Sequence, residues 1–529
     1  MKETIQLVKF ILRRERIGLN IWTTCIAGLV IYMPFLYEGM YPTVADRYAA
    51  MSMMQNPAIV AIVGPSTGAY TLGALFTQEI LLVTLVIIAI MNILLVNRHT
   101  RVDEELGRLE LIRSFPVGST STLQAVFAIV ILVNALIGGL IAIGLAMSGV
   151  ESVTVHGSVL IGGIITMTGL LFATITAVCV QLFSTAKGAS GYAFMVLLVM
   201  YLVRAVGDVS GNFLSYVSPL GLVLKARVYV DDIWWPIAAV LVQVVVLGGV
   251  AVYLISKRDL GMGLIPAKPG SRVAAKSLLS VDGLAWRLQR GSLIIWSISS
   301  FMIGVAYGAV IGEVEAYIGD NDIIQAILAT MGDSDGSLIE QFIPFLILFL
   351  VIVLLIPVIG PILKLAGEEK RNLSEHLLTR VVSRTNLLKS YWLISMITSV
   401  ILFIAGAFGF WLAGMIFLDE AVALSTLMSA VMVYLPAAWL IIGFAVILVG
   451  WLPKLMSLAT IMIGFTFFIA FFSEILNLPQ FLINLSPLAH VPSLPIDEFS
   501  AVTFLVMSII AALLMIVGFI GYSRRDIQG

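Results

Sequence analysis

The feature that most restricts the possible folds of this chain is a series of long apolar segments that recur over all of its 529 residues. An α-helix rises 1.5 Å per residue, so an apolar run of about 20 residues can cross the ~30 Å hydrocarbon core of a bilayer. Runs of that length predict an all-α polytopic membrane protein with twelve transmembrane helices. The expected ranges are 18–37, 74–96, 121–148, 157–184, 189–207, 233–255, 292–311, 341–364, 389–417, 424–450, 454–476 and 500–522.

Composition excludes most other classes. Apolar residues make up 60% of the chain and charged residues only 12%, whereas a soluble domain carries about a quarter charged. The 30 Lys and Arg against 31 Asp and Glu leave a net charge of -1, so no affinity for nucleic acid is expected. Cys25 and Cys179 both lie inside apolar runs and are expected to pack as small hydrophobic residues.

The distribution of cations predicts the orientation of the chain. If the N-terminus is cytoplasmic, all Lys and Arg residues fall in inner segments except Arg47, Arg204, Lys225 and Arg227. Such a bias follows the positive-inside rule and places both termini in the cytoplasm. The expected outer loop 312–341 agrees, because it is acidic and contains no cation.

Four similarities between the two parts of the chain indicate a tandem repeat. Sequence around Trp22, Glu104, Lys187 and Phe213 has matches around Trp296, Glu369, Lys454 and Phe481, at nearly constant spacing. We therefore expect two six-helix halves of the same topology, related by a pseudo-twofold axis along the membrane normal. The halves comprise residues 1–255 and 284–529, and a cytoplasmic linker, 256–283, joins them.

No motif for catalysis or cofactor binding is present in the sequence. The phosphate-binding pattern G-x-x-x-x-G-K-[ST] does not occur. The four histidines lie in different loops and predict neither a metal site nor a catalytic triad. We expect a protein that is not an enzyme and that holds no cofactor of its own.

The most informative part of the sequence is the loop after the second expected helix, together with its copy in the second half. We call residues 97–120 the first inner segment and residues 367–388 the second inner segment. Leu106, Leu109, Ile112 and Phe115 are spaced by three, which predicts an amphipathic helix on the inner membrane surface. Such a helix either tethers two spans or docks a cytosolic partner, and its duplication favours docking to a two-fold partner.

The first inner segment resembles the pattern of type-2 ABC exporter permeases. The resemblance is carried by an acidic pair, a Gly, a Glu-Leu and a Pro-Val, at Glu104, Gly107, Glu110, Pro116 and Val117. In the second inner segment Glu369 and Glu375 are kept, while Asn372 stands in place of the Gly and Val381 in place of the Pro.

The whole chain resembles the fused twelve-helix tetronasin-resistance or polyketide-antibiotic exporter permeases. This resemblance implies an elbow helix before each half, a coupling helix in each inner segment and two copies of a separate cytosolic ATPase. ATP and Mg would bind to the ATPase. The cargo would be a small apolar or amphipathic drug or antibiotic that is exported across a bacterial cell membrane.

Charges within the expected spans are few, so Glu79, Arg204 and Asp208 are candidates for the transport pathway or its gate, as are Pro219 and Pro487 at the outer ends of two spans. Arg204 and Asp208 are four residues apart and are expected to pair on one helix face. Pro219 and Pro487 follow the fifth and eleventh spans, where they either end a helix or begin a re-entrant helix that closes the outer end of the pathway.

Glu79 lies in the outer third of the second span with no cation within one turn, so it is either protonated or faces water. It supports an alternative function, a proton-coupled twelve-helix drug antiporter in which Glu79 carries the proton. A sensor or scaffold without transport activity is a third class, which only the duplication disfavours.

Overall fold

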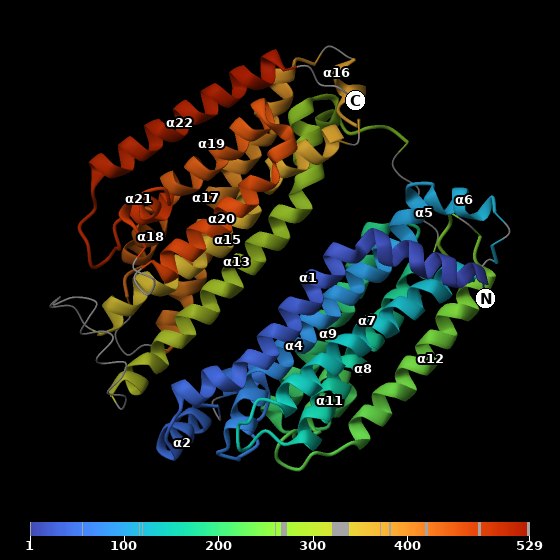
Figure 1. Cartoon of the computed structure of the whole chain (residues 1–529). Coiled ribbons are helices and arrows are strands. Elements are labelled where there is room, and N and C mark those ends of the chain that lie inside the picture. The colour runs from blue at the N-terminus through green and yellow to red at the C-terminus, as the bar shows by residue number, and fades with distance from the viewer. Residues whose placement is uncertain are drawn as a thin grey trace. The chain divides into compact units, whose positions relative to one another are not determined.

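The computed structural model describes residues 2–54, 57–115, 117–118, 120–259, 261–265, 272–319, 338–370, 372–379, 382–417, 422–473 and 478–525. Contacts between residues divide the chain into two compact units, Met1–Gly270 and Ser271–Gly529. Helices make up both units, and the described residues contain no β-strand, only an isolated bridge between Phe183 and Ile265. Figure 1 shows the helices of both units.

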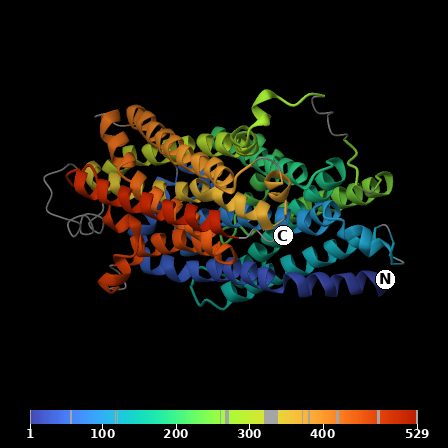
Figure 2. The same ribbon diagram turned by 90° about the horizontal axis from the view of Figure 1, so that it is seen from above.

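The described part of the first unit contains six long helices. They are α1 (Lys2–Met40), α4 (Leu72–Asn97), α7 (Ser121–Ala146), α8 (Val155–Leu182), α9 (Ala186–Ser210) and α12 (Trp235–Lys257). Short helices lie between them: α2 (Val44–Met53), α3 (Pro57–Val63), α5 (Asp103–Glu105), α6 (Arg108–Arg113), α10 (Leu214–Val217) and α11 (Pro219–Leu224). In Figures 1 and 2 the N-terminal end of α1 and the α5–α6 segment lie at the same end of this unit.

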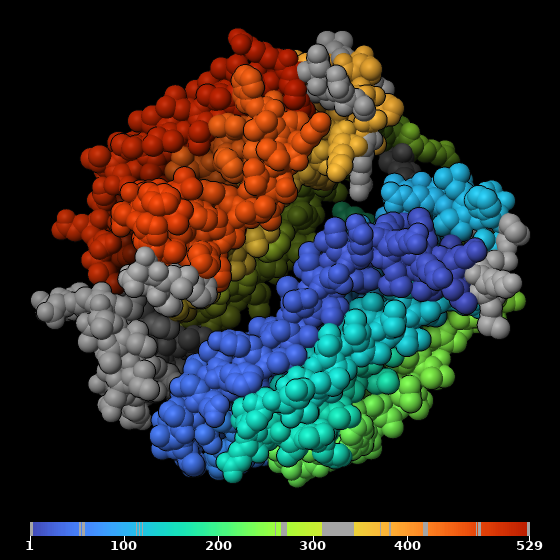
Figure 3. Space-filling view, in the orientation of Figure 1, coloured from blue at the N-terminus to red at the C-terminus, as the bar shows by residue number. Residues whose placement is uncertain are grey.

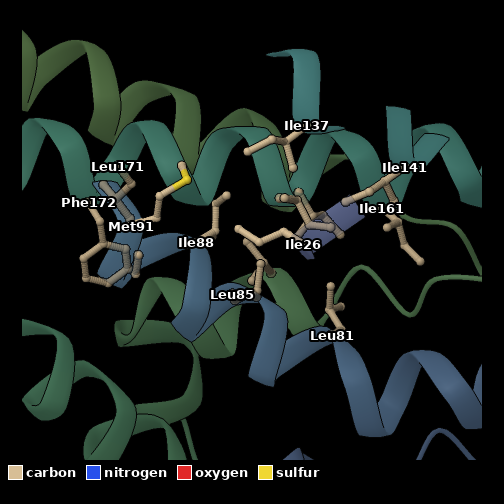
Figure 4. Packing of buried hydrophobic residues seen from close by; sticks show 14 of the residues in the cluster. Ile26, Leu81, Leu85, Ile88, Met91, Ile137, Ile141, Ile161, Leu171 and Phe172 are labelled. Atoms are coloured by element: carbon tan, nitrogen blue, oxygen red, sulfur yellow. The ribbon is translucent and has the colours of Figure 1, made fainter. Parts of the chain in front are cut away.

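Helix α8 is the central element of the first unit, because it packs extensively against α7, α12 and α4. Branched and aromatic side chains fill the space between α1, α4, α7 and α8, including Leu85, Ile137 and Phe172 (Figure 4). Close packing of α7 on α8 requires glycine, since a Cβ on Gly138 would lie 2.4 Å from the carbonyl oxygen of Gly162. Small residues at such crossings are typical of membrane helices.

A buried polar pair lies inside this apolar core. Asn92 of α4 and Asn134 of α7 donate hydrogen bonds to each other, at 3.0 and 2.8 Å. Gly169 of α8 leaves the space for this pair, because a Cβ there would lie 1.9 Å from Oδ1 of Asn134. Each amide also donates to a carbonyl of its own helix, so both side chains are satisfied without water.

The second unit is built from a similar series of helices. They are α13 (Val281–Gly319), α15 (Leu338–Lys370), α16 (Glu375–Leu378), α17 (Arg384–Phe417), α18 (Leu424–Met432), α19 (Leu435–Trp451), α20 (Ser457–Phe472), α21 (Gln480–Ile483) and α22 (Ala501–Arg524). Glycines again mark the closest crossings: Gly304 and Gly409 between α13 and α17, and Gly450 and Gly518 between α19 and α22. The C-terminal end of α22 and helix α16 lie at the same end of this unit (Figure 1).

Eleven helices within the described residues are long and apolar enough to span a membrane, so the chain is a multi-pass membrane protein. The span expected at 454–476 corresponds to α20, which falls below 18 residues because the described helix ends at Phe472. The span expected at 424–450 is divided into α18 and α19, and Pro436 lies in the first turn of α19.

Two expectations about the membrane ends need correction. Helix α1 runs without interruption from Lys2 to Met40, and so begins well before the span that the sequence predicted from residue 18. The first inner segment was expected to be one amphipathic helix, but it is divided between α5 and α6. The division occurs at Gly107, whose φ of +69° is incompatible with continued right-handed helix.

Candidate functional site

The first inner segment is a helix–turn–helix at one end of the first unit. Helix α4 continues through a π-helical turn, Arg98–Val102, directly into α5. Gly107 then takes the left-handed conformation and redirects the chain into α6. As a result, the chain turns between α5 and α6, so that Leu109 of α6 is buried while Glu110 and Leu111 are exposed.

Glu104 joins the first inner segment to the end of the last helix of the unit. Its carboxylate accepts hydrogen bonds from Arg101 at 2.9 Å, from Arg258 at 3.0 Å and from the backbone N–H of Gly261 at 2.7 Å. Arg258 is the residue directly after α12. The side chains of Glu104 and Arg258 are only 6% and 5% exposed, so this ion pair is desolvated.

The same segment is bound to the turn between α8 and α9. Arg101, which is buried, donates to the carbonyl oxygen of Ser184 at 2.5 Å and to that of Gly261 at 3.1 Å. The carboxylate of Glu105 accepts a hydrogen bond from the N–H of Ala186, the first residue of α9, at 2.6 Å. Movement of α5 would therefore disturb α9 as well as α12.

A second group of charges connects the first inner segment to α1. Asp103 accepts hydrogen bonds from Arg14 of α1 at 2.8 Å and from Arg108 of α6 at 3.0 Å. Glu15 of α1 forms an ion pair with Arg98 at 3.1 Å. The first inner segment thus contacts α1, α9 and α12 through charged groups.

The second unit repeats the central part of this arrangement. Glu369 of α15 accepts hydrogen bonds from Arg525 and from the hydroxyl of Tyr522, both at 2.5 Å. Arg525 is the residue directly after α22, as Arg258 is the residue directly after α12. Arg525 also donates to the carbonyl oxygen of Val449 in α19.

The turn that follows the glutamate is also repeated. Asn372 has φ of +58° and therefore takes the same left-handed conformation as Gly107. Asn is one of the few residues other than Gly that adopt this conformation at low cost. The replacement of Gly by Asn in the second inner segment therefore preserves the backbone turn.

The two glutamates after the turns are exposed. Glu110 lies on α6 and Glu375 on α16. Beside Glu110, Leu111 and Phe115 are 70% and 68% exposed. Pro116 and Val381 lie outside the described residues.

An apolar groove of about 440 Å³ separates α6 from the N-terminal part of α1. It is lined by Gln6, Leu7, Phe10, Leu111, Ile112, Phe115 and Val117. In Figure 3 the surfaces of α1 and of the α5–α6 segment adjoin at this end of the unit. An exposed apolar surface beside charged groups is typical of a protein-interaction site.

Arg204 and Asp208 lie at the opposite end of the first unit and form a buried ion pair at 3.3 Å. The guanidinium of Arg204 also donates to the carbonyl oxygens of Ala61 and Ile62 at 2.9 and 3.1 Å, and so binds the end of α3. The hydroxyl of Ser215 donates to Asp208. These contacts fix α3 and α10 against α9.

Pro219 and Pro487 occupy equivalent positions in their units. Pro219 is the first residue of α11, and Pro487 is the first residue of a 3₁₀ helix, Pro487–His490. Each follows a buried serine, Ser218 or Ser486. Proline is favoured at the first position of a helix because a backbone N–H at that position has no acceptor within the helix, so its absence costs nothing.

Glu79 has a hydrogen-bond partner that sequence reasoning missed. The hydroxyl of Tyr37 in α1 donates to its carboxylate, and the ring of Tyr41 lies 5.8 Å from that of Tyr37. Within the part of the chain that the structure describes, no cation pairs with Glu79. Glu79 is therefore half-buried and hydrogen-bonded to a tyrosine whose ring packs against a second tyrosine.

Comparison with known proteins identifies relatives of the chain. Residues 278–523 match the family described as multidrug efflux system permease Rv1217c, C-terminal domain. The whole chain is similar to the multidrug efflux system permease protein Rv1217c of Mycobacterium tuberculosis, with 33% identity over 539 residues. The matched region covers 99% of this chain and 95% of that relative. The chain, a multi-pass all-α membrane protein, therefore belongs to the family of the multidrug efflux system permease Rv1217c.

Proposed function

We propose that the chain is the membrane-spanning permease subunit of an ATP-driven multidrug exporter, powered by a separate ABC ATPase dimer. The name of the M. tuberculosis relative supports multidrug efflux. The repeated inner segments support the ATPase partnership. In each of them, the glutamate before the left-handed turn is bound to an arginine of the same unit, and the glutamate after the turn is exposed. This repetition is the observation that carries the proposal. The proposal includes membership of the tetronasin-resistance type of exporter permease, which the sequence resembles.

The proposal includes a tandem architecture of twelve spans in two six-helix halves, with α20 as the eleventh span. The pair Glu104–Arg258 and its counterpart Glu369–Arg525 support this architecture. Both arginines directly follow the last helix of their unit, and both glutamates precede a left-handed turn by three residues. A chain built from two related halves offers two equivalent docking positions to a dimeric ATPase.

The docking surface would consist of α6 with the adjoining groove in the first unit and of α16 in the second unit. Glu110 and Glu375 would pair with cations of the ATPase. Leu111 and Phe115 would enter an apolar pocket of that partner, because large exposed apolar side chains gain most from burial at an interface. ATP and Mg would bind to the ATPase and not to this chain. In this arrangement both termini are cytoplasmic.

The second candidate function is proton-coupled drug antiport, and the hydrogen bond between Tyr37 and Glu79 favours it. A carboxylate within a membrane span that has a neutral donor and no described cation can exchange a proton. The same site equally suits an ATP-driven exporter of amphipathic cations, since a carboxylate and the adjacent ring of Tyr37 attract positive charge. In both cases the cargo is small and apolar or amphipathic.

The deciding experiment measures cargo efflux by the purified complex. The chain is co-expressed with the ABC ATPase encoded beside it, and the composition of the complex is determined by native mass spectrometry. We expect one permease to two ATPase chains, with efflux from vesicles that stops when ATP is withdrawn. Efflux that continues without ATP and stops with an uncoupler would establish the antiporter instead.

A further inference from the structure

We propose that Arg258 and Arg525 are positioning residues for energy coupling. Each would bind an inner segment to the last helix of its unit, so that movement of the inner segment is passed to α12 or α22. The inference deepens the proposed function and rests on it. In this inference Glu104 and Glu369 bind each inner segment to its own unit, whereas Glu110 and Glu375 contact the ATPase.

The first pair has the properties of a rigid connection. Arg258 and Glu104 are both almost fully shielded from water, and the N–H of Gly261 also donates to Glu104. Separating the two charges would remove a desolvated ion-pair contact, which is unfavourable because water does not replace it at this site. The pair is therefore expected to stay closed while α5 moves, and to carry the end of α12 with it.

Helix α12 packs on α8 along its length, and the pair Glu104–Arg258 connects its end to the first inner segment. Only 11% of the most apolar 18-residue stretch of α12 is buried within the structure, because α12 has α8 as its main neighbour. Beyond its end, the N–H groups of Leu264 and Ile265 donate to the carbonyls of Gln181 and Leu182. The inner segment, the end of α12 and the α8–α9 turn thus form one hydrogen-bonded cluster.

The second pair makes the same connection with different neighbours. Arg525 binds Glu369 and the carbonyl oxygen of Val449, so it joins α15 to the end of α19 as well as to α22. Tyr522, one turn before Arg525, donates to the same carboxylate. The repeated element is thus the glutamate–arginine pair itself, which supports a role common to both halves.

The test compares each arginine with the residue directly before it. Arg258→Gln and Arg525→Gln remove the ion pairs, whereas Lys257→Gln and Arg524→Gln remove exposed charges one position earlier. Each variant is purified with the ATPase, and cargo export and ATP hydrolysis are measured in the same vesicles. The ratio of cargo exported to ATP hydrolysed is the informative quantity, because a purely structural defect lowers the amount of active complex without changing this ratio.

We expect the ratio to fall about tenfold in each arginine variant, within the usual range of coupling between two sites. The ATPase should still bind, and the two control variants should keep the wild-type ratio. If a glutamine variant does not accumulate in the membrane, the lysine variant replaces it. Lysine keeps the charge but not the fork geometry, so a two- to threefold fall is expected.

A wild-type ratio in both arginine variants, or an equal fall in the controls, would overturn the inference. Failure of the proposed function is recognised separately, because export by the wild-type complex would then not depend on ATP.

Discussion

Glu104 and Arg258 form a buried ion pair at 3.0 Å between the first inner segment and the end of α12, although 154 residues separate them in the chain. Glu369 and Arg525 form the corresponding pair in the second unit. In each inner segment the glutamate before the left-handed turn, Glu104 or Glu369, therefore has a different environment from the glutamate after it, Glu110 or Glu375. The first is buried against an arginine of its own unit, while the second is exposed.

The buried position of Glu104 predicts that Glu104→Gln destabilises the protein. Removal of the charge leaves Arg101 and Arg258 buried beside a neutral amide, and breaking such a pair costs about 3 kcal/mol. The measurement is thermal unfolding of the detergent-purified chain. Glu110→Gln is the matched control and should change stability by less than about 0.5 kcal/mol, because Glu110 is exposed. Equal stability of both variants would contradict the buried pair.

Charge reversal at the exposed glutamates should uncouple transport without unfolding the chain. In Glu110→Lys and Glu375→Lys, a cation would face the cations expected on the ATPase, and like-charge contact at an interface costs several kcal/mol. We expect Glu110→Lys to be the more severe, since the first inner segment is nearer to the exporter pattern. Drug efflux from cells and co-purification of the ATPase measure the effect.

Glu151→Lys, which reverses an exposed charge outside the inner segments, is the control for both variants. Wild-type efflux in Glu110→Lys and Glu375→Lys would contradict docking and would indicate that the inner segments only tether two spans.

The left-handed turns predict that a substitution at Gly107 or Asn372 destabilises its inner segment only if the new residue disfavours a positive φ. Gly107→Ala should destabilise the first inner segment by about 1 kcal/mol, because a Cβ there has no steric neighbour but meets an unfavourable φ. Asn372→Gly should be neutral within about 0.5 kcal/mol, since Gly accepts the same φ. Asn372→Ala should resemble Gly107→Ala. Hydrogen exchange in the two inner segments checks these expectations, and slower exchange in Gly107→Ala would refute them.

Glu79 separates the two transport mechanisms. In an ATP-driven exporter, Glu79→Gln should change which substrates are exported, with cationic cargo reduced most, while efflux still requires ATP. In an antiporter the same change removes the proton carrier and stops efflux of every substrate. Efflux is measured with ATP depleted or with an uncoupler in turn. Tyr37→Phe is the companion variant, because it removes the hydrogen bond and keeps the carboxylate.

Much of the architecture follows from local features of the sequence. Long apolar runs predict membrane helices, because an unpaired backbone is too costly within a bilayer. The spacing of four residues between Arg204 and Asp208 predicted their pairing, because residues four apart lie on one helix face. The break at Gly107 was missed, since a single glycine between charged helix formers is compatible with either a continuous helix or a turn.

The sequence by itself determined the class of protein and the approximate places of most spans, because these depend on hydrophobicity over short ranges. Only the tertiary structure decided which glutamate is anchored and which is exposed. Arg258 and Arg525 lie 154 and 156 residues from their glutamates, and Tyr37 lies 42 residues from Glu79. Burial of a charge becomes favourable only when packing brings its partner within hydrogen-bond distance, and no local pattern encodes that approach.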